Sequence, residues 1–131
     1  MTNTLAPELL RVCDANLNRL KEGVRVVEDI ARYKDDNKTL SLKLKELRHL
    51  AQVDDMKPFL QNRDSINDVL RQSTTSEMKR ESLASIITAN FKRAQESSRV
   101  LEELYKLVDP ELSENFKYIR YSLYALEKEF I

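Results

Sequence analysis

The sequence predicts an all-α protein, an antiparallel helical bundle built from a duplicated αα-hairpin with pseudo-twofold symmetry. Three observations predict this fold. A stretch of 21 residues recurs with its polar and apolar positions in step, and a second repeated stretch follows each copy. The chain of 131 residues also contains only one glycine and three prolines and is rich in Leu, Lys, Glu and Arg, a composition that favours helices over a sheet.

The first repeated stretch is CDANLNRLKEGVRVVEDIARY at 13–33, and it returns as ITANFKRAQESSRVLEELYKL at 87–107, an offset of 74 residues. Its apolar positions recur in steps of three and four, which is the period of a helix. The second stretch runs from Leu40 to Arg48 and returns from Leu112 to Arg120, an offset of 72 residues. The difference of two residues belongs in the turn between the two helices, where changes of length are tolerated.

The first helix should begin at Pro7, because proline suits the first turn, with Thr4 as a cap. We expect this helix to run to about Tyr33, where KDDNKT ends it. The second helix should extend from Leu40 to about Val53, since the following Pro58 disfavours helical geometry at the residue before it. These two helices form the first hairpin.

The third helix should begin at Thr74, which forms a capping box with Glu77, and reach about Leu107. Asp109 and Pro110 then provide the cap and the first turn of a fourth helix. Between the hairpins we expect a loop with one short helix. The chain therefore reads as a single helical domain, residues 1–131, with hairpin one at 5–53, a connecting loop at 54–76 and hairpin two at 77–131.

Composition excludes several classes of protein. The 22 basic and 22 acidic side chains give no wide basic field for nucleic acid. No signal peptide and no apolar run of membrane-spanning length are visible, so we expect a cytoplasmic protein. Cys13 is the one cysteine, which excludes an internal disulfide framework, and it lies on the apolar stripe as a small core residue. Because Gly23 is the one glycine, glycine-rich nucleotide loops are absent and side chains must build any phosphate site.

A sector beside the apolar stripe of each repeated helix carries amide, guanidinium and small side chains: Asn16, Arg19 and Gly23 on the first helix, and Asn90, Arg93 and Ser97 on the third. A guanidinium can hold phosphate with two hydrogen bonds, and an asparagine can donate to and accept from a heterocycle. The two sectors therefore predict a seam for a small anionic ligand. The alternative is that the asparagines fix helix register and the arginines pair with glutamates three residues on, Glu22 and Glu96.

Other repeated charges have a functional and a structural interpretation. The cations of the second and fourth helices, Lys45, Arg48, Lys117 and Arg120, could extend an anion site, or they could be solvated helix charges. Arg25 and Arg99 have an acidic residue four positions on, the spacing of an ordinary ion pair. Glu28 and Glu102 are weaker candidates for a metal ligand or a base.

The connecting loop offers Arg63, Asp64 and Asp68 within six residues. An arginine can hold phosphate and two carboxylates can hold Mg²⁺, an arrangement that phosphoryl transfer could use. The alternative is turn chemistry, since loops are rich in aspartate for conformational reasons. His49 has no metal-binding partner at a suitable spacing.

Three tyrosines, Tyr118, Tyr121 and Tyr124, step by three along the fourth helix, largely off its core stripe. A row of exposed aromatic side chains is typical of a contact with a ligand or with another protein chain. The sequence therefore predicts a partner surface here, including a contact between copies in a homo-oligomer.

Four motifs carry a resemblance to a known family: DANLNRLKEGVRVVEDIARY, LKLKELRH, RDSINDV and ITANFKRAQESSRVLEELYKL. In this order, over residues 10 to about 108, the chain resembles the helical domain that precedes the barrel in some bacterial and cyanobacterial thiamine-phosphate synthases. The resemblance implies a place in thiamine biosynthesis. It also implies the role proposed for that domain, a substitute hydroxymethylpyrimidine-phosphate kinase that supplies the pyrimidine diphosphate used by the synthase.

The resemblance also implies roles for the residues at the matching positions. Arg19, Arg63 and Arg93 would hold phosphate, Asn16 and Asn90 would contact the pyrimidine, and Asp64 and Asp68 would bind Mg²⁺ or act as a base, with ATP as phosphoryl donor. A second reading is a non-catalytic partner that delivers substrate to a separate synthase barrel. Two features depart from the family pattern. The chain stops at Ile131 without a barrel, so we do not expect it to couple pyrimidine to thiazole alone, and VLRQ follows Asp68 where the family has a glycine.

Overall fold

The computed structural model describes residues 5–130, apart from the side chain of Ser76, and the described chain is all helix, turn and loop without a strand. The predicted all-α fold is confirmed. Its elements in chain order are α1 (Pro7–Asp29), the π-helical turn η1 (Ile30–Lys34), α2 (Lys38–Leu50), α3 (Lys57–Asn62), α4 (Thr75–Met78), α5 (Leu83–Tyr105), α6 (Pro110–Glu127) and the 3-10 turn η2 (Lys128–Phe130). None of the described helices is long and apolar enough to span a membrane.

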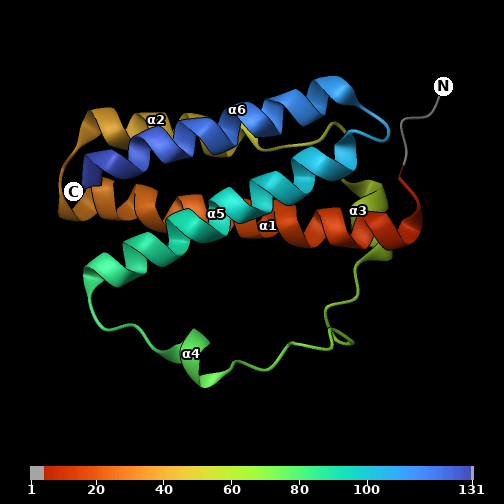
Figure 1. Ribbon diagram of the computed structural model, residues 1–131, viewed down its shortest axis with the longest axis horizontal. Coiled ribbons are helices and arrows are strands. Elements are labelled where there is room, and N and C mark those ends of the chain that lie inside the picture. Colours follow the sequence, from red (N-terminus) through yellow and green to blue (C-terminus); the bar gives the residue numbers. More distant parts are fainter. Residues whose placement is uncertain (1–4, 131) are drawn as a thin grey trace.

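Four long helices, α1, α2, α5 and α6, form the bundle. They are arranged in two layers (Figure 1). Helices α1 and α5 lie side by side in one layer, and α2 and α6 lie above them in the other. Helix α2 packs on α1, and α6 packs on α5. Each neighbouring pair runs antiparallel, as predicted for a bundle of hairpins with short turns.

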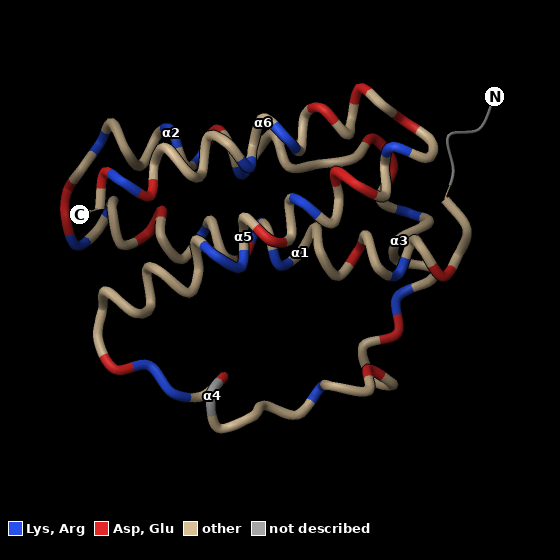
Figure 2. The backbone as a smooth tube through the Cα atoms, viewed as in Figure 1, with Lys and Arg blue, Asp and Glu red and all other residues tan. Residues whose placement is uncertain are grey.

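The predicted apolar stripes form the core. None of the side chains in the stripe of α1, which continues into η1, is more than 1% exposed: Cys13, Leu17, Leu20, Val24, Val27 and Ala31. On α5 the buried copies are Phe91, Ala94, Ser98, Leu101 and Tyr105. Aromatic rings close both ends of the second hairpin, since Phe91 contacts Phe130 edge to face at 5.4 Å and Tyr105 stacks on Phe116 at 5.8 Å. Charged residues of both signs are distributed along the long helices (Figure 2).

Gly23 lies at a close contact between α1 and α5. A Cβ atom at this position would lie 2.8 Å from the backbone oxygen of Asn90 and 3.4 Å from the Cβ of Ala94. The first distance is shorter than atoms of this kind adopt, so the absence of a side chain permits the close approach of the two helices.

The first hairpin follows the prediction closely. Helix α1 begins at Pro7 and continues through η1 to Lys34, although the expected cap Thr4 lies outside the described residues. Asp36 has a left-handed φ of 47°, which aspartate tolerates better than most side chains, and the chain turns there. The Asn37 side chain accepts from the amide of Leu40 at 3.0 Å, so α2 begins two residues earlier than expected.

The predicted start of the third helix is wrong. The Thr74 hydroxyl does accept from the amide of Glu77, at 3.3 Å, but it caps only the four-residue helix α4. The chain then leaves helical geometry, and α5 begins at Leu83 after a reciprocal capping box between Ser82 and Ser85. A capping box is a local arrangement that one turn can satisfy. The described side chains of α4, namely Thr75, Glu77 and Met78, are all exposed and give no packing that would extend the helix.

The connection between the hairpins contains two short helices instead of one. In α3, Pro58 occupies the first turn and Phe59 is 3% exposed beneath α1. From residue 65 to residue 82 the chain then swings away from the bundle and returns at the start of α5 (Figure 1). We call residues 65–82 the arch. Large apolar side chains of the arch are open to solvent, namely Ile66, Val69, Leu70 and Met78.

Candidate functional site

A hollow of about 580 Å³ lies between the first half of α1 and the chain that follows α3. We call it the loop-side hollow. Four of the predicted site residues line it, together with Arg11 and the buried Asp14: Arg19 from α1, and Arg63, Asp64 and Asp68 from the loop. The structure therefore brings together the two parts of the sequence that were singled out for phosphate and metal chemistry.

Arg63 is held by a carboxylate that sequence reasoning missed. Its Nε and Nη2 atoms donate to the two oxygens of Asp14, both at 2.7 Å, and Asp14 is only 4% exposed. These hydrogen bonds raise the pKa of Arg63. The repeat could not reveal Asp14, because the matching position in the second half is Thr88. The guanidinium of Arg63 thus holds the loop against α1 through Asp14.

Both loop aspartates stabilise turns. The Asp64 carboxylate accepts from the side chain of Asn67 at 2.8 Å and from its backbone amide at 3.1 Å, which lowers the pKa of Asp64. Asp68 accepts from the amide of Leu70 at 3.0 Å. Arg11 donates to the backbone oxygen of Asp64 at 3.3 Å. Within the described residues no cluster of three or more His, Cys, Asp or Glu side chains could hold a metal ion.

A smaller hollow of about 200 Å³ lies between α1 and α5, and we call it the seam hollow. Asn16, Arg19, Arg93 and Ser97 line it, so four members of the two predicted sectors do meet. Asn90 does not line it. Its side chain donates to the backbone oxygen of Ile86 at 2.8 Å, just as Asn16 donates to Val12 at 2.8 Å.

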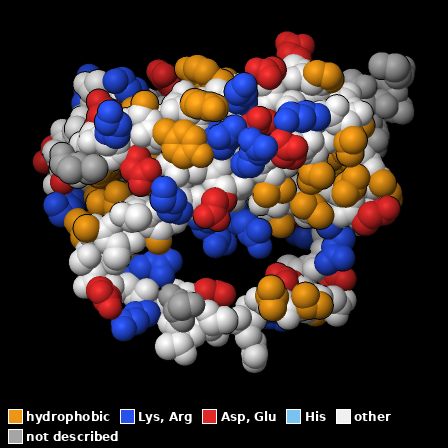
Figure 3. All heavy atoms as spheres, viewed as in Figure 1, with side chains coloured by type: hydrophobic (Ala, Val, Ile, Leu, Met, Phe, Trp, Pro, Cys, Tyr) orange, Lys and Arg blue, Asp and Glu red, His pale blue; other side chains and the backbone are white. Residues whose placement is uncertain are grey.

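Arg19 and Arg93 are both exposed at this seam. Neither makes an ion pair with any carboxylate in residues 5–130, including the expected partners Glu22 and Glu96. An arginine without a carboxylate keeps all of its donors for water or for an anionic ligand. Figure 3 shows basic side chains along the edge of the bundle that borders the opening under the arch.

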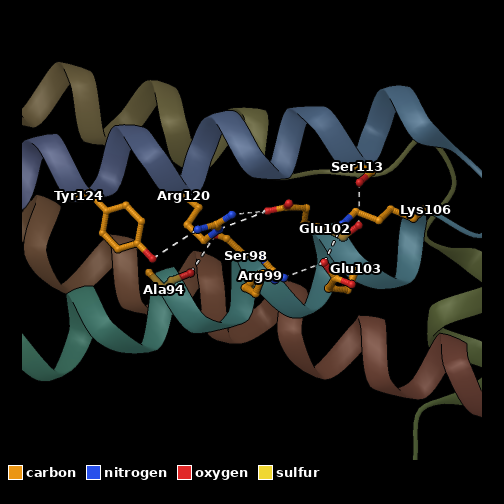
Figure 4. A network of polar contacts seen from close by, with 9 residues as sticks. All are labelled: Ala94, Ser98, Arg99, Glu102, Glu103, Lys106, Ser113, Arg120 and Tyr124. Atoms are coloured by element: carbon orange, nitrogen blue, oxygen red, sulfur yellow. Dashed lines mark hydrogen bonds and ion pairs between the residues drawn. The ribbon is translucent and has the colours of Figure 1, made fainter.

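Arg120 is buried in an ion pair instead of facing a ligand (Figure 4). Its Nη2 and Nε atoms lie 2.8 and 3.2 Å from one oxygen of Glu102, and the Tyr124 hydroxyl lies 3.5 Å from Nη1. The hydrogen bonds to Tyr124 and Glu102 raise the pKa of Arg120. The Ser113 hydroxyl donates to the backbone oxygen of Glu102 at 2.7 Å, which ties α6 to α5 again.

The first half contains the same pair at the matching positions. Arg48 donates from Nε and Nη2 to the two oxygens of Glu28, at 2.7 and 3.2 Å, and Glu28 is 2% exposed. Arg48 and Arg120 line neither the loop-side hollow nor the seam hollow. Each of these arginines, predicted to bind phosphate, therefore neutralises a buried glutamate and holds the two helices of its hairpin together.

The remaining repeated charges and the tyrosine row lie at the surface. The pairs Arg25–Asp29 and Arg99–Glu103 have N···O distances of 3.3 and 3.0 Å and exposed side chains, as their spacing predicts. Lys45, Lys117 and His49 are exposed as well. Tyr118, Tyr121 and Tyr124 are 59%, 57% and 41% exposed.

Comparison with known proteins identifies relatives of the chain. The model of the ThiD2 family matches residues 11–129. A thiamine-phosphate synthase of Thermosynechococcus vestitus is 39% identical over 92% of this chain and 34% of its own length. Those of Synechocystis and Rhodopirellula baltica are 39% and 37% identical, over 91% and 98% of this chain and 35% and 36% of their own lengths.

The chain therefore spans about a third of the length of these relatives. No solved structure matches it. The family match covers nearly all of the described bundle, from the first turns of α1 to the end of α6. The chain belongs to the ThiD2 family.

Proposed function

We propose that this chain acts in thiamine biosynthesis, where it binds a phosphorylated hydroxymethylpyrimidine and transfers a phosphoryl group to it from ATP. The observation that carries the proposal is the loop-side hollow, which Arg19 lines from α1 and Asp64 and Asp68 line from the loop. Family membership and the relatives named thiamine-phosphate synthase support the pathway. The product would be the pyrimidine diphosphate.

Phosphoryl transfer depends on positioning and on neutralisation of charge, both of which the side chains of this hollow can supply. Arg19 has its donors available for phosphate oxygens, and Arg11 lies on the same hollow. The ion pair between Arg63 and Asp14 keeps the loop in place without taking part in the reaction.

The residues present fit a magnesium ion bound together with a nucleotide. Mg²⁺ is usually held by one or two carboxylates, several waters and the phosphates of the substrate, and Asp64 and Asp68 line one hollow. When bound, the ion would neutralise charge on the transferring phosphate. The acceptor is a phosphate monoester with a second pKa of about 6, so its attacking oxygen is already ionised at neutral pH and no general base is needed. We therefore assign both aspartates to the metal.

The experiment is to incubate the purified chain with hydroxymethylpyrimidine phosphate and Mg-ATP and to follow the diphosphate by mass spectrometry. We expect formation of the diphosphate, its loss when EDTA removes magnesium, and a rate reduced about tenfold or more in Asp64→Asn/Asp68→Asn. Asp35→Asn, at an exposed carboxylate that follows η1 and does not line the loop-side hollow, is the matched control and should keep the wild-type rate. Absence of the diphosphate with every nucleoside triphosphate tested would exclude the kinase.

A second candidate function is that of a non-catalytic partner of a separate thiamine-phosphate synthase. One observation favours it: Tyr118, Tyr121 and Tyr124 are exposed along α6. This function predicts no turnover, but binding to a synthase that depends on the phosphorylated pyrimidine. Gel filtration of the two proteins, with and without that ligand, would distinguish the two candidates.

A further inference from the structure

The loop-side hollow and the seam hollow share one side chain. Arg19 lines both of them, whereas Arg11, Asp64 and Asp68 line only the first and Arg93 lines only the second. The two hollows are therefore neighbours along α1 and share Arg19 as a common lining residue. This arrangement is not needed for a site that binds one ligand.

We propose that the two hollows are separate subsites of one phosphotransfer site, a proposal that rests on the kinase function above. The loop-side hollow takes the nucleoside triphosphate and the seam hollow takes the small phosphorylated pyrimidine. Arg19 lines both and binds the phosphoryl group that passes from one to the other.

The sizes and linings of the hollows assign the ligands. At about 580 Å³ the loop-side hollow is within the range of about 300–1,000 Å³ typical of pockets for drug-sized ligands, and a nucleotide is of this class. Four carboxylates line it, namely Glu8, Asp14, Asp64 and Asp68. Asp14 is paired with Arg63, and Asp64 and Asp68 are the two assigned to the metal of a metal–triphosphate complex. The seam hollow, at about 200 Å³, suits a smaller molecule.

The polar groups of the seam hollow match a phosphorylated heterocycle. Asn16 is 6% exposed and uses one amide hydrogen on the backbone of Val12, so its oxygen and its other hydrogen remain for the edge of a ring. Arg93 lines the hollow from α5, and its guanidinium, in addition to that of Arg19, can hold the phosphate of the acceptor. The seam hollow thus offers an amide for the ring and two cations for the phosphate, together with one carboxylate, that of Glu96.

The step at Arg19 balances without a further reactant. An ionised oxygen of the acceptor phosphate forms a bond to the γ-phosphorus, and the bond from that phosphorus to the oxygen bridging the β-phosphate breaks. The electron pair of the broken bond stays on the β-phosphate, which leaves as part of the nucleoside diphosphate. No proton is transferred. Arg19 donates to the equatorial oxygens of the transferring group, where charge is spread in the transition state.

The test uses single variants of the full chain and calorimetric titration with two probes, Mg-adenylyl imidodiphosphate and hydroxymethylpyrimidine phosphate. Arg11→Ala should weaken the nucleotide alone and Arg93→Ala the pyrimidine alone, each by about tenfold, because each removes a charge-assisted hydrogen bond. Arg19→Ala should weaken both. Arg25→Ala, an exposed arginine of α1 outside both hollows, is the control and should change neither affinity.

Two results would overturn the subsites: Arg19→Ala leaving one affinity unchanged, or Arg11→Ala and Arg93→Ala each weakening both ligands equally. Failure of the wild-type chain to bind either probe would also overturn them. The kinase is judged separately, by formation of the diphosphate. If the variants change the two affinities as expected but no diphosphate forms, the result supports the subsites and opposes the kinase. If the diphosphate forms but the affinities do not change as expected, the result supports the kinase and opposes the subsites.

Discussion

Each half of the bundle buries one glutamate against one arginine. Glu28 and Glu102 are 2% and 4% exposed, and Arg48 and Arg120 reach them from the neighbouring helix of the same hairpin. A charge taken out of water is costly unless a partner of opposite charge satisfies it, so these pairs matter most when one member is removed. They hold the helices of each hairpin in register.

Arg120→Ala should lower the free energy of unfolding by about 3 kcal/mol, because Glu102 would remain buried without its partner. The matched control is Arg99→Ala on the exposed face of α5, which should cost about 0.5 kcal/mol or less. Chemical denaturation at neutral pH measures both values. Equal losses in the two variants would show that the buried pair contributes no more than a surface pair.

The thiol of Cys13 provides a second prediction at this scale. Burial raises the pKa of Cys13 from 9.0 to about 11, so the folded chain keeps its proton at pH values where the unfolded chain loses it. The free energy of unfolding should therefore keep its full value below pH 9 and should fall as the pH rises toward 11. Unfolding measured from pH 8 to 10 should show this slope in the wild type and a flatter one in Cys13→Ala. An equally steep slope in the variant would contradict the assignment.

Arginines that recur in both halves of the chain have different roles, which the sequence alone could not distinguish. Arg19 and Arg48 were both predicted to hold phosphate, and both recur in the second half. Arg48 is neutralised by Glu28, a residue 20 positions away on another helix, whereas Arg19 has no such neighbour among the described residues. A helical wheel shows the face of one helix only, and this difference depends on how two helices are placed.

At the scale of the helices, the contact of α1 with α5 at Gly23 determines how closely the two hairpins approach. The atom that a new side chain would meet is the backbone oxygen of Asn90, which cannot rotate away as a flexible side chain would. The seam hollow lies along the same contact, since Asn16 and Ser97 line it. A change of helix spacing at Gly23 would therefore also change the width of that hollow.

Gly23→Ala should destabilise the chain by about 1–2 kcal/mol, although alanine is the better helix former by about 1 kcal/mol. The added methyl group would lie 2.8 Å from the Asn90 oxygen, and the helices would have to separate. Ser97→Ala, at the matching position of α5, is the control. It adds no atom and removes a hydroxyl that donates only to the backbone of its own helix, so it should be nearly neutral. Stabilisation of Gly23→Ala would show that the helices separate at little cost.

The existence of the four long helices was predictable because their apolar positions keep a helical period over many turns. The residue at which α5 begins was not predictable in this way. Thr74 and Ser82 both offer a capping hydroxyl, and only the second precedes a stretch that packs on the bundle. Burial against other helices decides where a helix continues, and a single sequence does not specify that burial. The pseudo-twofold relation of the halves stays a prediction, although the same ion pair recurs in both.

For the molecule as a whole, the arch is the segment with the weakest attachment. The side-chain hydrogen bonds of Asn67, Leu70, Glu77, Arg80 and Ser82 reach partners no more than three positions away in the chain, and four large apolar side chains of the arch are exposed. The bundle beside it is held by a continuous core that both hairpins share. The two parts should therefore differ strongly in local stability.

Trypsin should first cut the native chain in the arch, after Arg71, Lys79 or Arg80, all of which are exposed. Arg25 and Arg99 are exposed too, but they lie within long helices and should resist, which makes them internal controls. Because α1 and α5 pack along their length, the two fragments should stay together in gel filtration and separate only in denaturant. Early cuts within the helices, or separation of the fragments under native conditions, would contradict this picture.

The span of the arch also determines whether the two hairpins of one chain can meet. It runs the length of the bundle, from the end of α3 to the start of α5 (Figure 1). Extended, it could reach about 60 Å, against about 35 Å for a helix of 23 residues. Deleting about ten of its residues would leave too short a tether, so the second hairpin would have to be supplied by another copy. Light scattering should then find a domain-swapped dimer in which each bundle combines helices of two chains.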